Sequence, residues 1–372
     1  MKVEFDQGPL NGGTVFADPV DVVRVTDPSG VEAGLERLQD LRDRGLWLAG
    51  CLSYELGYCF SSKLRPLMPE NRTTPLIEMA AFTAPTRSGV CAVKDVGPLA
   101  LRPAWSAEEY GAAFAPLAAH IRAGDCYQVN LTFPLSAHLS CPAEHLYQRM
   151  RAQHPLEYGA FVDLGEEQII SRSPELFFSV DAGGFIRTRP MKGTRPRMSD
   201  PAADAAQIAD LKCSEKDRAE NLMIVDLLRN DLSRLSRLGS VKVPELFKIE
   251  SYATVHQMTS TVEARLRDGV DLPEILRAIF PCGSVTGAPK IRAMQIIRAL
   301  EPAPRGQYCG AIGWAAPEGR MCFNVAIRTL SCARDGKIRL NVGGGVVYDS
   351  VAENEYQEAL WKARFAGTVR TI

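Results

Sequence analysis

The chain has 372 residues, of which 46% are hydrophobic, and its 43 Lys and Arg against 44 Asp and Glu leave a formal net charge of −1. This composition is ordinary for a soluble globular protein, and the near-zero charge gives no electrostatic basis for binding nucleic acid or a membrane surface. The length allows about two to three average domains or one large elaborated domain. No apolar run approaches the roughly 20 residues that span a bilayer, and the first residues lack the apolar core of a signal peptide.

The 10 cysteines are scattered along the chain, and none belongs to a C-x-x-C pair. That spacing argues against a zinc cluster. Several cysteines lie within apolar stretches, where a free thiol behaves as a small hydrophobic side chain. We therefore expect free thiols and a reducing, cytoplasmic location.

The first hundred residues are rich in Gly, Pro and short apolar runs, and residues 46–57 are predicted to form a strand that enters a turn. The pattern sharpens at Ser106, because Glu109 completes a capping box and apolar residues follow at helical spacing as far as Gly124. Further helices are predicted at about 215–234, 272–280 and 289–300 and from near 353, and strands at 126–133, 159–164, 168–172, 176–180, 184–189, 254–265, 309–314, 321–331 and 337–342.

This mixture of strands and helices predicts one large α+β or α/β body over residues 105–372. Residues 1–104 either add to that body or form an N-terminal subdomain. Our working division therefore places an N-terminal subdomain at 1–104 and a catalytic core at 105–372.

Lys192 lies in a short basic segment between Pro190 and Gly193. Proline biases its predecessor toward extended structure, and glycine allows tight backbone geometry. A lysine presented from such a turn is a candidate nucleophile. A solvated basic loop is the ordinary alternative.

Two predicted helices carry carboxylates that suit a metal ion. Glu220 precedes the segment 222–228, which is almost wholly apolar, so we expect its helix to be largely buried and its charge to need a partner, either a neighbouring cation or a metal. On the last helix Glu355, Glu358 and Lys362 share one face. An all-oxygen site suits Mg²⁺ and not zinc, and the alternative is a solvated charged face.

The loop 282–290 combines glycines with the start of a helix, which is typical of an anion site. Thr286, Gly287 and Lys290 lie in it, but the spacing is not that of a Walker loop, so a carboxylate ligand is as plausible as a phosphate. A purely structural turn is the alternative.

Three further polar residues lie in or beside predicted strands. Arg328 faces away from the apolar face of strand 321–330, where it is a candidate for bidentate capture of a carboxylate. A surface ion pair is the more common alternative for a lone strand arginine. His256 follows extended residues and is by default a core histidine. Glu175 precedes an apolar strand, and apolar surroundings raise a carboxyl pKa in a way that suits a general acid. A surface charge at the end of the strand is the more common alternative.

Taken together, these segments resemble the chorismate-utilising enzymes, which include the component I chains of anthranilate synthase and aminodeoxychorismate synthase, isochorismate synthases and salicylate synthases. The resemblance covers residues 105–372. Its motifs are Asp125-Cys-Tyr-Gln-Val-Asn130, Ser173-Pro-Glu175, Pro190-Met-Lys-Gly-Thr194, Asp217-Arg-Ala-Glu-Asn221, Val225-Asp-Leu-Leu-Arg-Asn-Asp231, Gly283-Ser-Val-Thr-Gly-Ala-Pro-Lys290, Asn324-Val-Ala-Ile-Arg-Thr329 and Glu355-Tyr-Gln-Glu358.

The resemblance implies the family's fold, a large mixed β-sheet sandwich flanked by helices, and a role for each candidate residue. Mg²⁺ would be held by Glu220 with Glu355 or Glu358 and would bind the ring carboxylate of chorismate. The remaining substrate contacts implied are Thr286, Gly287 and Lys290 at that end, Tyr308, Arg328 and Gly344 at the enolpyruvyl carboxylate, and Lys362 and His256 lining the pocket.

Lys192 indicates the branch of the family. Anthranilate synthases resemble Pro-Ile-Ala-Gly-Thr at this place, whereas a lysine resembles aminodeoxychorismate synthase component I. The resemblance then implies that Lys192 attacks ring carbon C2 with Glu175 as general acid, which is covalent catalysis. We also hypothesise that the arginines at 187, 189, 195 and 197 keep this amine neutral, if they lie close to it.

The expected ammonia source is a separate glutamine amidotransferase subunit, and a separate aminodeoxychorismate lyase would act downstream, since the chain shows neither a glutaminase segment nor a fused lyase. Residues 46–57 resemble part of the family's tryptophan pocket. Alternatives are anthranilate synthase, isochorismate or salicylate synthase, and, from another class, a non-catalytic chorismate-binding regulatory protein. A phosphate-binding NTPase is weaker, because the loop spacing fails.

Overall fold

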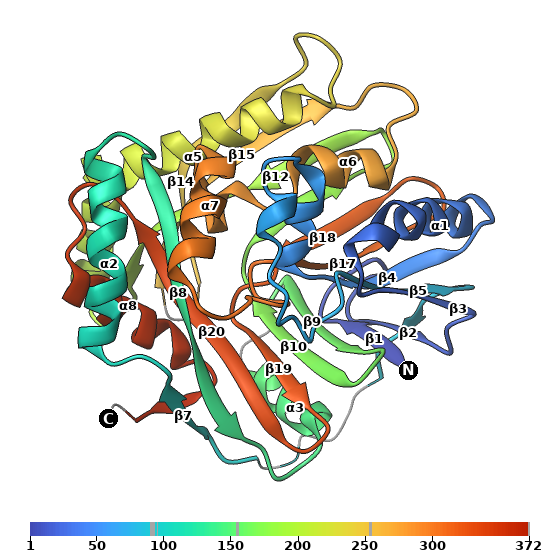
Figure 1. Cartoon of the computed structure of the whole chain (residues 1–372), viewed down its shortest axis with the longest axis horizontal. Helices are drawn as coiled ribbons and strands as arrows, with labels where there is room; N and C mark the ends of the chain where they lie inside the picture. Colours follow the sequence, from blue (N-terminus) through green and yellow to red (C-terminus); the bar gives the residue numbers. More distant parts are fainter. Residues whose placement is uncertain (90–93, 95, 154–155, 253–254, 371–372) are drawn as a thin grey trace.

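Two large β-sheets form the centre of the molecule, and helices cover their outer faces (Figure 1). The structure is a computed structural model that describes residues 1–89, 94, 96–153, 156–252 and 255–370. The sheets pack face to face through a hydrophobic cluster in which Val3 and Val162 of one sheet meet Cys51 and Ile312 of the other. This confirms the α+β sandwich flanked by helices.

The larger sheet has 11 strands, and its strand order begins at the C-terminal strand and ends at a short edge strand near residue 86. In spatial order they are β21 (Gly367–Val369), β7 (Leu99–Pro103), β8 (Gln128–His138), β20 (Lys337–Val346), β19 (Thr329–Ala333), β10 (Glu167–Ser173), β9 (Tyr158–Asp163), β1 (Lys2–Phe5), β2 (Thr14–Ala17) and β6 (Thr86–Arg87), with β16 (Gly287–Ala288) beside β8.

The second sheet has 10 strands. In spatial order they are β13 (Met191–Pro196), β15 (Val255–Arg265), β12 (Phe185–Arg189), β11 (Leu176–Val180), β18 (Met321–Val325), β17 (Ala311–Ala315), β4 (Trp47–Leu52), β5 (Ile77–Phe82) and β3 (Asp21–Val25), with β14 (Lys242–Ser251) beside β15.

The helices divide between the two sheets. Those that pack on the larger sheet are α2 (Ala107–Arg122), α3 (Ala143–Gln153), α7 (Lys290–Leu300) and α8 (Ala352–Ala363). Those on the smaller sheet are α1 (Val31–Asp43), α4 (Pro201–Cys213), α5 (Glu215–Ser233) and α6 (Leu272–Ile279). Short 3-10 turns are η1 (Pro28–Gly30), η2 (Tyr54–Phe60), η3 (Arg65–Leu67) and η4 (Gly283–Val285).

Residues 1–104 contribute to both sheets. Strands β1, β2 and β6 lie in the larger sheet, and β3, β4 and β5 lie in the smaller one. The core cluster that contains Leu35 and Leu52 continues to Phe177 and Phe323 of the later chain. The first segment thus adds to the main body, which is one of the two arrangements that the sequence left open.

Most predicted elements are confirmed, including the capping box of Ser106 and Glu109 at the start of α2. The predicted continuous strand 321–331 is wrong, because β18 ends at Val325 in one sheet and β19 begins at Thr329 in the other. The chain crosses between the sheets at Arg328, whose φ is +50°. The expectation that the helix of Glu220 is largely buried is also wrong, since Leu222 is 44% exposed and α5 is amphipathic.

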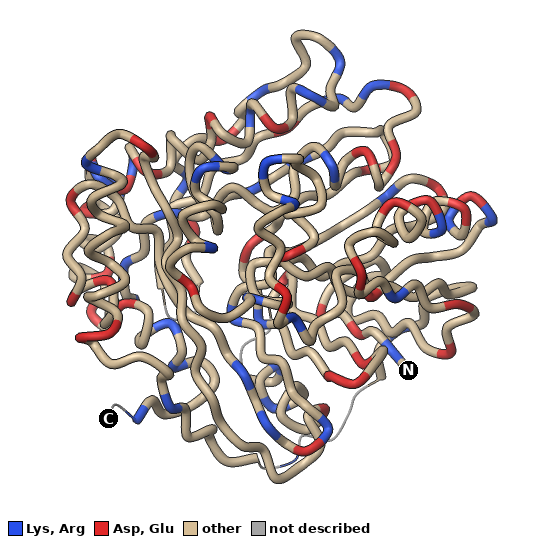
Figure 2. The backbone as a smooth tube through the Cα atoms, in the orientation of Figure 1, with Lys and Arg blue, Asp and Glu red and all other residues tan. Residues whose placement is uncertain are grey.

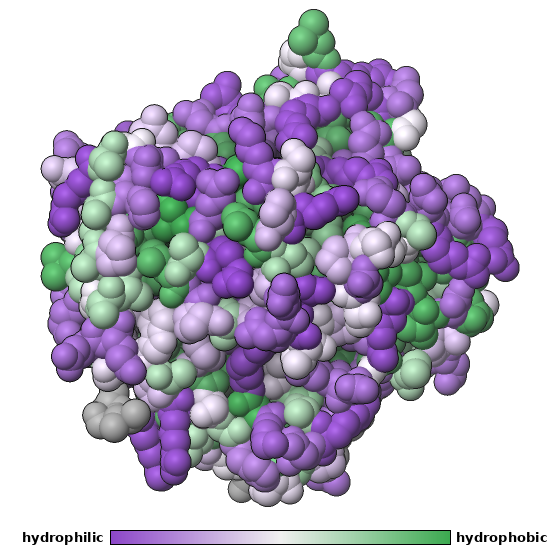
Figure 3. All heavy atoms as spheres, in the orientation of Figure 1, coloured by the Kyte–Doolittle hydropathy of each residue, from purple (hydrophilic) through white to green (hydrophobic). Residues whose placement is uncertain are grey.

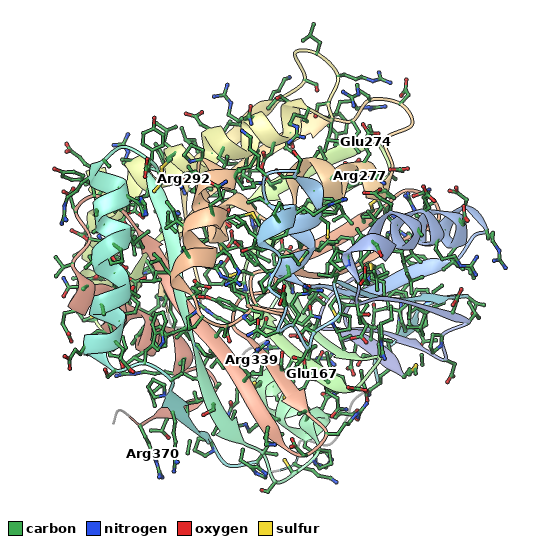
Figure 4. All side chains as sticks on the ribbon, viewed as in Figure 1. Glu167, Glu274, Arg277, Arg292, Arg339 and Arg370 are labelled. Carbon is green, nitrogen blue, oxygen red and sulfur yellow. The ribbon has the colours of Figure 1, made fainter. Side chains whose placement is uncertain are left out.

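The surface carries charges of both signs, with Lys and Arg interspersed among Asp and Glu around the outline (Figure 2). Hydrophilic residues cover most of the face seen in Figure 3, and hydrophobic ones form small scattered patches. Exposed ion pairs link neighbouring elements: Arg277 of α6 pairs with Glu32 of α1, and Arg292 of α7 pairs with Asp125. Figure 4 labels the two arginines on their helices. Such pairs contribute little stability individually.

Two expectations about the whole chain can be compared with the structure. The nine cysteines within the described residues are all free, whereas Cys91 lies outside them. Among the described helices, none has both the length and the apolar character needed to cross a membrane.

Candidate active site

A cavity of about 750 Å³ opens where β13, β20, α5 and α8 meet. This volume is in the range of small-molecule binding sites. Most of the predicted site residues line it, namely Glu175, Lys192, Glu220, Tyr308, Arg328, Gly344, Glu355, Glu358 and Lys362. Residues that are far apart in the sequence are therefore brought to one chemical site, as the separate motifs predict.

Lys192 lies on strand β13, and not in a turn as the sequence predicts. The register of β13 against β15 shifts between Met191 and Thr194, so the chain bulges at Lys192 and Gly193. Gly193 has a φ of +83°, and a β-carbon there would lie 2.9 Å from Leu211 Cδ1. The bulge thus needs glycine for both its backbone angle and its packing.

Burial lowers the pKa of the Lys192 amine, and the nearby positive charge of Lys362 lowers it further, while Glu220 opposes both. A buried amine is more easily neutral and therefore more nucleophilic. The hypothesis that nearby arginines supply the like charge is not supported. The arginines at 187, 189, 195 and 197 each form an ion pair with a carboxylate.

Glu175 lies immediately before β11 and is only 4% exposed. Burial raises the pKa of its carboxyl to about 7. Three contacts lower this pKa again: a 2.7 Å hydrogen bond from Ser284 Oγ and the positive charges of Lys192 and Arg328. A carboxyl group with this pKa holds a proton near neutral pH, which suits a general acid.

The three acidic residues predicted to bind metal enter the cavity from two helices, Glu220 from α5 and the others from α8. Burial raises the pKa of Glu220 and of Glu355, and the negative charge of Glu358 adds to the effect on Glu355. Lys362 lies 2.7 Å from Glu358 and holds the pKa of that carboxyl below its ordinary value. The carboxylates therefore repel one another except where Lys362 compensates.

Within the described ranges, no three His, Cys, Asp or Glu side chains are already gathered closely enough to hold a metal ion. Glu355 instead accepts a hydrogen bond of 2.7 Å from Ser350. The donor set nevertheless fits Mg²⁺, because three carboxylates face one cavity and a divalent cation would offset their repulsion. Gly344 leaves room beside them, since a β-carbon there would lie 3.2 Å from Glu355 Oε2.

Arg328 reaches the same cavity from the crossing between the sheets. Burial lowers the pKa of its guanidinium, and among the described residues none forms an ion pair with it. The backbone holds it in place, because Arg172 N–H donates a 2.9 Å hydrogen bond to the Arg328 carbonyl. A buried, unpaired guanidinium is suited to an anionic ligand, and Tyr308 lines the same cavity.

Four predicted substrate contacts do not line the cavity. His256 is fully buried and contacts Asp204 at 2.9 Å, while its neighbour Gln257 lines the cavity instead, because adjacent strand residues face opposite ways. Lys290 is held by Asp231 at 2.7 Å. The other two, Thr286 and Gly287, lie within the loop itself, where Thr286 Oγ1 donates to backbone carbonyls.

Reasoning from the sequence missed three cavity-side residues. Ser284 and Gln257 line the cavity beside Glu175 and the bulge. Gln128 is fully buried with both amide atoms lacking a partner in the described structure. A β-carbon at Gly345 would lie 2.9 Å from Gln128 Cδ and 3.0 Å from Lys192 Nζ. The motif 125–130 contains Gln128, but no periodic pattern distinguishes it from the other strand residues.

The sequence profile of a family described as chorismate binding enzyme matches residues 86–367. The chain belongs to this family. It is 45% identical over 283 residues to aminodeoxychorismate synthase component 1 of Salmonella typhimurium, which covers 75% of this chain and 60% of that protein. It is also 44% identical to anthranilate synthase component 1 of Streptomyces coelicolor, over 66% of this chain and 48% of that one.

The fold of the family agrees with the structure. Anthranilate synthase component I from Streptococcus pneumoniae superposes with a TM-score of 0.83 at 26% identity, over 95% of this chain and 92% of that one. The chain thus spans nearly all of a solved relative but only about 60% of the Salmonella protein.

Proposed function

We propose that this chain converts chorismate and ammonia to 4-amino-4-deoxychorismate, as the first component of an aminodeoxychorismate synthase. The observation that carries this proposal is the Lys192 amine, which has a lowered pKa and faces one cavity with Glu175 and three further carboxylates. The names of the relatives support the same chemistry.

The proposed reaction is a pair of displacements on the chorismate ring. Neutral Lys192 forms a bond to ring carbon C2 while the C4–oxygen bond breaks, and Glu175 gives its proton to the departing hydroxyl, which leaves as water. Ammonia then adds at C4, and the bond between C2 and the Lys192 nitrogen breaks. One difficult substitution becomes two easier ones.

Mg²⁺ is part of the proposal. Glu220, Glu355 and Glu358 would hold it, and when bound it would neutralise the ring carboxylate of the substrate. At the other end of the substrate, the guanidinium of Arg328 is suited to the enolpyruvyl carboxylate, and Tyr308 lines the same cavity. The backbone at Gly344, which the resemblance assigns to that carboxylate, lies instead beside Glu355 and Lys362. Two anchored carboxylates would orient the ring against the Lys192 amine.

Ammonia would come from a separate glutamine amidotransferase, as the component 1 naming of the relatives suggests. The product keeps its enolpyruvyl group, so a separate lyase would release pyruvate and 4-aminobenzoate. With free buried thiols in the chain, a reducing cytoplasm is the proposed location.

The test is a product assay with purified protein, chorismate, MgCl₂ and an ammonium salt. We expect aminodeoxychorismate, which yields 4-aminobenzoate only after a lyase is added. Direct formation of anthranilate, or formation of isochorismate or salicylate without ammonia, would assign the chain to another branch of the family. Chorismate binding without any product would indicate a regulatory protein.

A further inference from the structure

The bulge that carries Lys192 is held by one side chain from the neighbouring strand. Gln257 Nε2 donates a 2.9 Å hydrogen bond to the carbonyl of Gly193, and Gln257 Oε1 accepts a 3.0 Å hydrogen bond from Thr194 Oγ1. Both partners are the residues that directly follow Lys192. Gln257 is 7% exposed and lines the cavity.

These contacts lie where ordinary sheet pairing is interrupted. Met191 pairs with Thr259 and Thr194 pairs with Gln257, so Lys192 and Gly193 together oppose one residue of β15. A bulge leaves backbone groups outside the ladder and redirects a side chain. The amide of Gln257 supplies a hydrogen bond to one of those groups, the Gly193 carbonyl.

The bulge is also closely packed against two helices. A β-carbon at Gly193 would lie 2.9 Å from Leu211 Cδ1 of α4 and 3.0 Å from Asp217 Cβ of α5. The backbone at Gly193 is therefore restrained both by this packing and by the hydrogen bond from the Gln257 amide. Release of the amide would leave only one of these two restraints.

We propose that Gln257 is a positioning residue for Lys192: its amide holds the β13 bulge so that the lysine amine stays buried in the cavity. The inference rests on the proposed function and deepens it, because it names the side chain that orients the nucleophile Lys192. An amide suits this role because one group both donates to a carbonyl and accepts from a hydroxyl. Leucine has similar size but can do neither.

The main test compares Gln257→Leu with Gln168→Leu. Gln168 is a matched control, since its amide bonds Asp163 at 2.8 Å on strand β10, and it does not line the cavity. For Gln257→Leu we expect kcat to fall about 10- to 100-fold, as a misplaced reacting group does, with KM for chorismate changed by less than about twofold. Gln168→Leu keeps both constants.

A second readout does not depend on turnover. The pH dependence of Lys192 acetylation by acetic anhydride, a small amine-reactive reagent that releases acetate, is followed by peptide mass spectrometry and reports the pKa of the amine. Its midpoint should rise by about one unit in Gln257→Leu, because a relaxed bulge reduces burial. The groups that face this amine and must remain unchanged are Glu175, Glu220, Glu358 and Lys362.

Thr194→Val provides a variant that keeps the shape of the strand if Gln257→Leu does not fold. It removes one of the two hydrogen bonds, so kcat and the labelling midpoint should move in the same direction by a smaller amount. Because both substitutions remove hydrogen bonds of the same Gln257 amide, the fold-decrease in kcat of the double variant should be smaller than the product of the two single decreases.

An unchanged kcat and midpoint in Gln257→Leu or Thr194→Val would overturn the proposal, as would equal losses in Gln168→Leu. Failure of the proposed function is a separate outcome. In that case the unmodified protein makes no aminodeoxychorismate, while the labelling midpoints still report whether Gln257 positions Lys192.

Discussion

Burial raises the pKa of the Glu175 carboxyl group, whereas a hydrogen bond lowers it. Burial raises its pKa to about 7, and the hydrogen bond from Ser284 limits that rise. Glu175 must be protonated to act as an acid, so kcat/KM should fall as the pH rises through this pKa.

Ser284→Ala should raise the pKa of Glu175 further and move the alkaline limb of the kcat/KM profile to higher pH. The profile is measured for chorismate at a constant concentration of free ammonia. Ser284→Thr keeps the hydroxyl and serves as the control. A limb that stays in place in Ser284→Ala would show that another group controls it.

At the residue scale, the sequence predicts which residue types carry the chemistry, but it does not predict which of two adjacent strand residues faces the cavity. Lys192 was found because it lies between Pro190 and Gly193, and Glu175 because its carboxyl group directly precedes an apolar strand. His256 is the core histidine that its sequence context predicts by default, and it does not line the cavity as the family resemblance implies. The sequence does not single out Gln257, because residues 255–262 are buried on both faces of β15 and show no alternation. Only the pairing with β13 decides which of the two faces the cavity.

At the scale of elements, the bulge in β13 is the feature on which the site depends. Gly193→Ala should lower both stability and kcat, since it adds a steric clash to an unfavourable φ of +83°. Gly184→Ala is the matched control, because its φ is +74° and a β-carbon there meets nothing within 4 Å. Gly184→Ala should lower the free energy of unfolding by about 1 kcal/mol and keep full activity. Urea unfolding and steady-state kinetics measure the two effects, and equal behaviour of the variants would contradict this account.

Glu220 of α5 lines the same cavity as Glu355 and Glu358 of α8, and this arrangement leads to a prediction about metal binding. MgCl₂ should raise the melting temperature, because a ligand that binds only the folded state stabilises it. Glu220→Gln should reduce that increase, yet leave the metal-free protein at least as stable, since one repelling charge is removed.

Asp226→Asn is a suitable control, because Asp226 lies on α5, pairs with Arg229 and does not line the cavity. Differential scanning fluorimetry with and without MgCl₂ gives the comparison. A full Mg²⁺ response in Glu220→Gln would remove Glu220 from the metal site.

The helix α2 was predictable, because a capping box begins it and apolar residues repeat at helical spacing over several turns. The break between β18 and β19 was not. The apolar face of Met321, Phe323, Val325 and Ile327 ends at the crossing, where Thr329 takes the next position on that face, but no glycine or proline marks the break. The strand breaks because the chain passes from one sheet to the other between β18 and β19, and Arg328 adopts a positive φ in this crossing.

At the scale of the whole molecule, the strands of residues 1–104 are shared between both sheets. We therefore expect calorimetry to show one unfolding transition with no separate early event for the N-terminal segment. Two resolved transitions, the first of which leaves the cavity intact, would instead support an independent subdomain.

The central claim concerns a bond between one side chain and the substrate. The most direct measurement mixes the protein with chorismate and MgCl₂ without ammonia, quenches the reaction and analyses its peptides by mass spectrometry. The account predicts a substrate-derived adduct, formed with loss of water, on the peptide that contains Lys192, and no such adduct in Lys192→Ala. Rapid amination by Lys192→Ala, or turnover of the unmodified protein with no adduct at this residue, would contradict it.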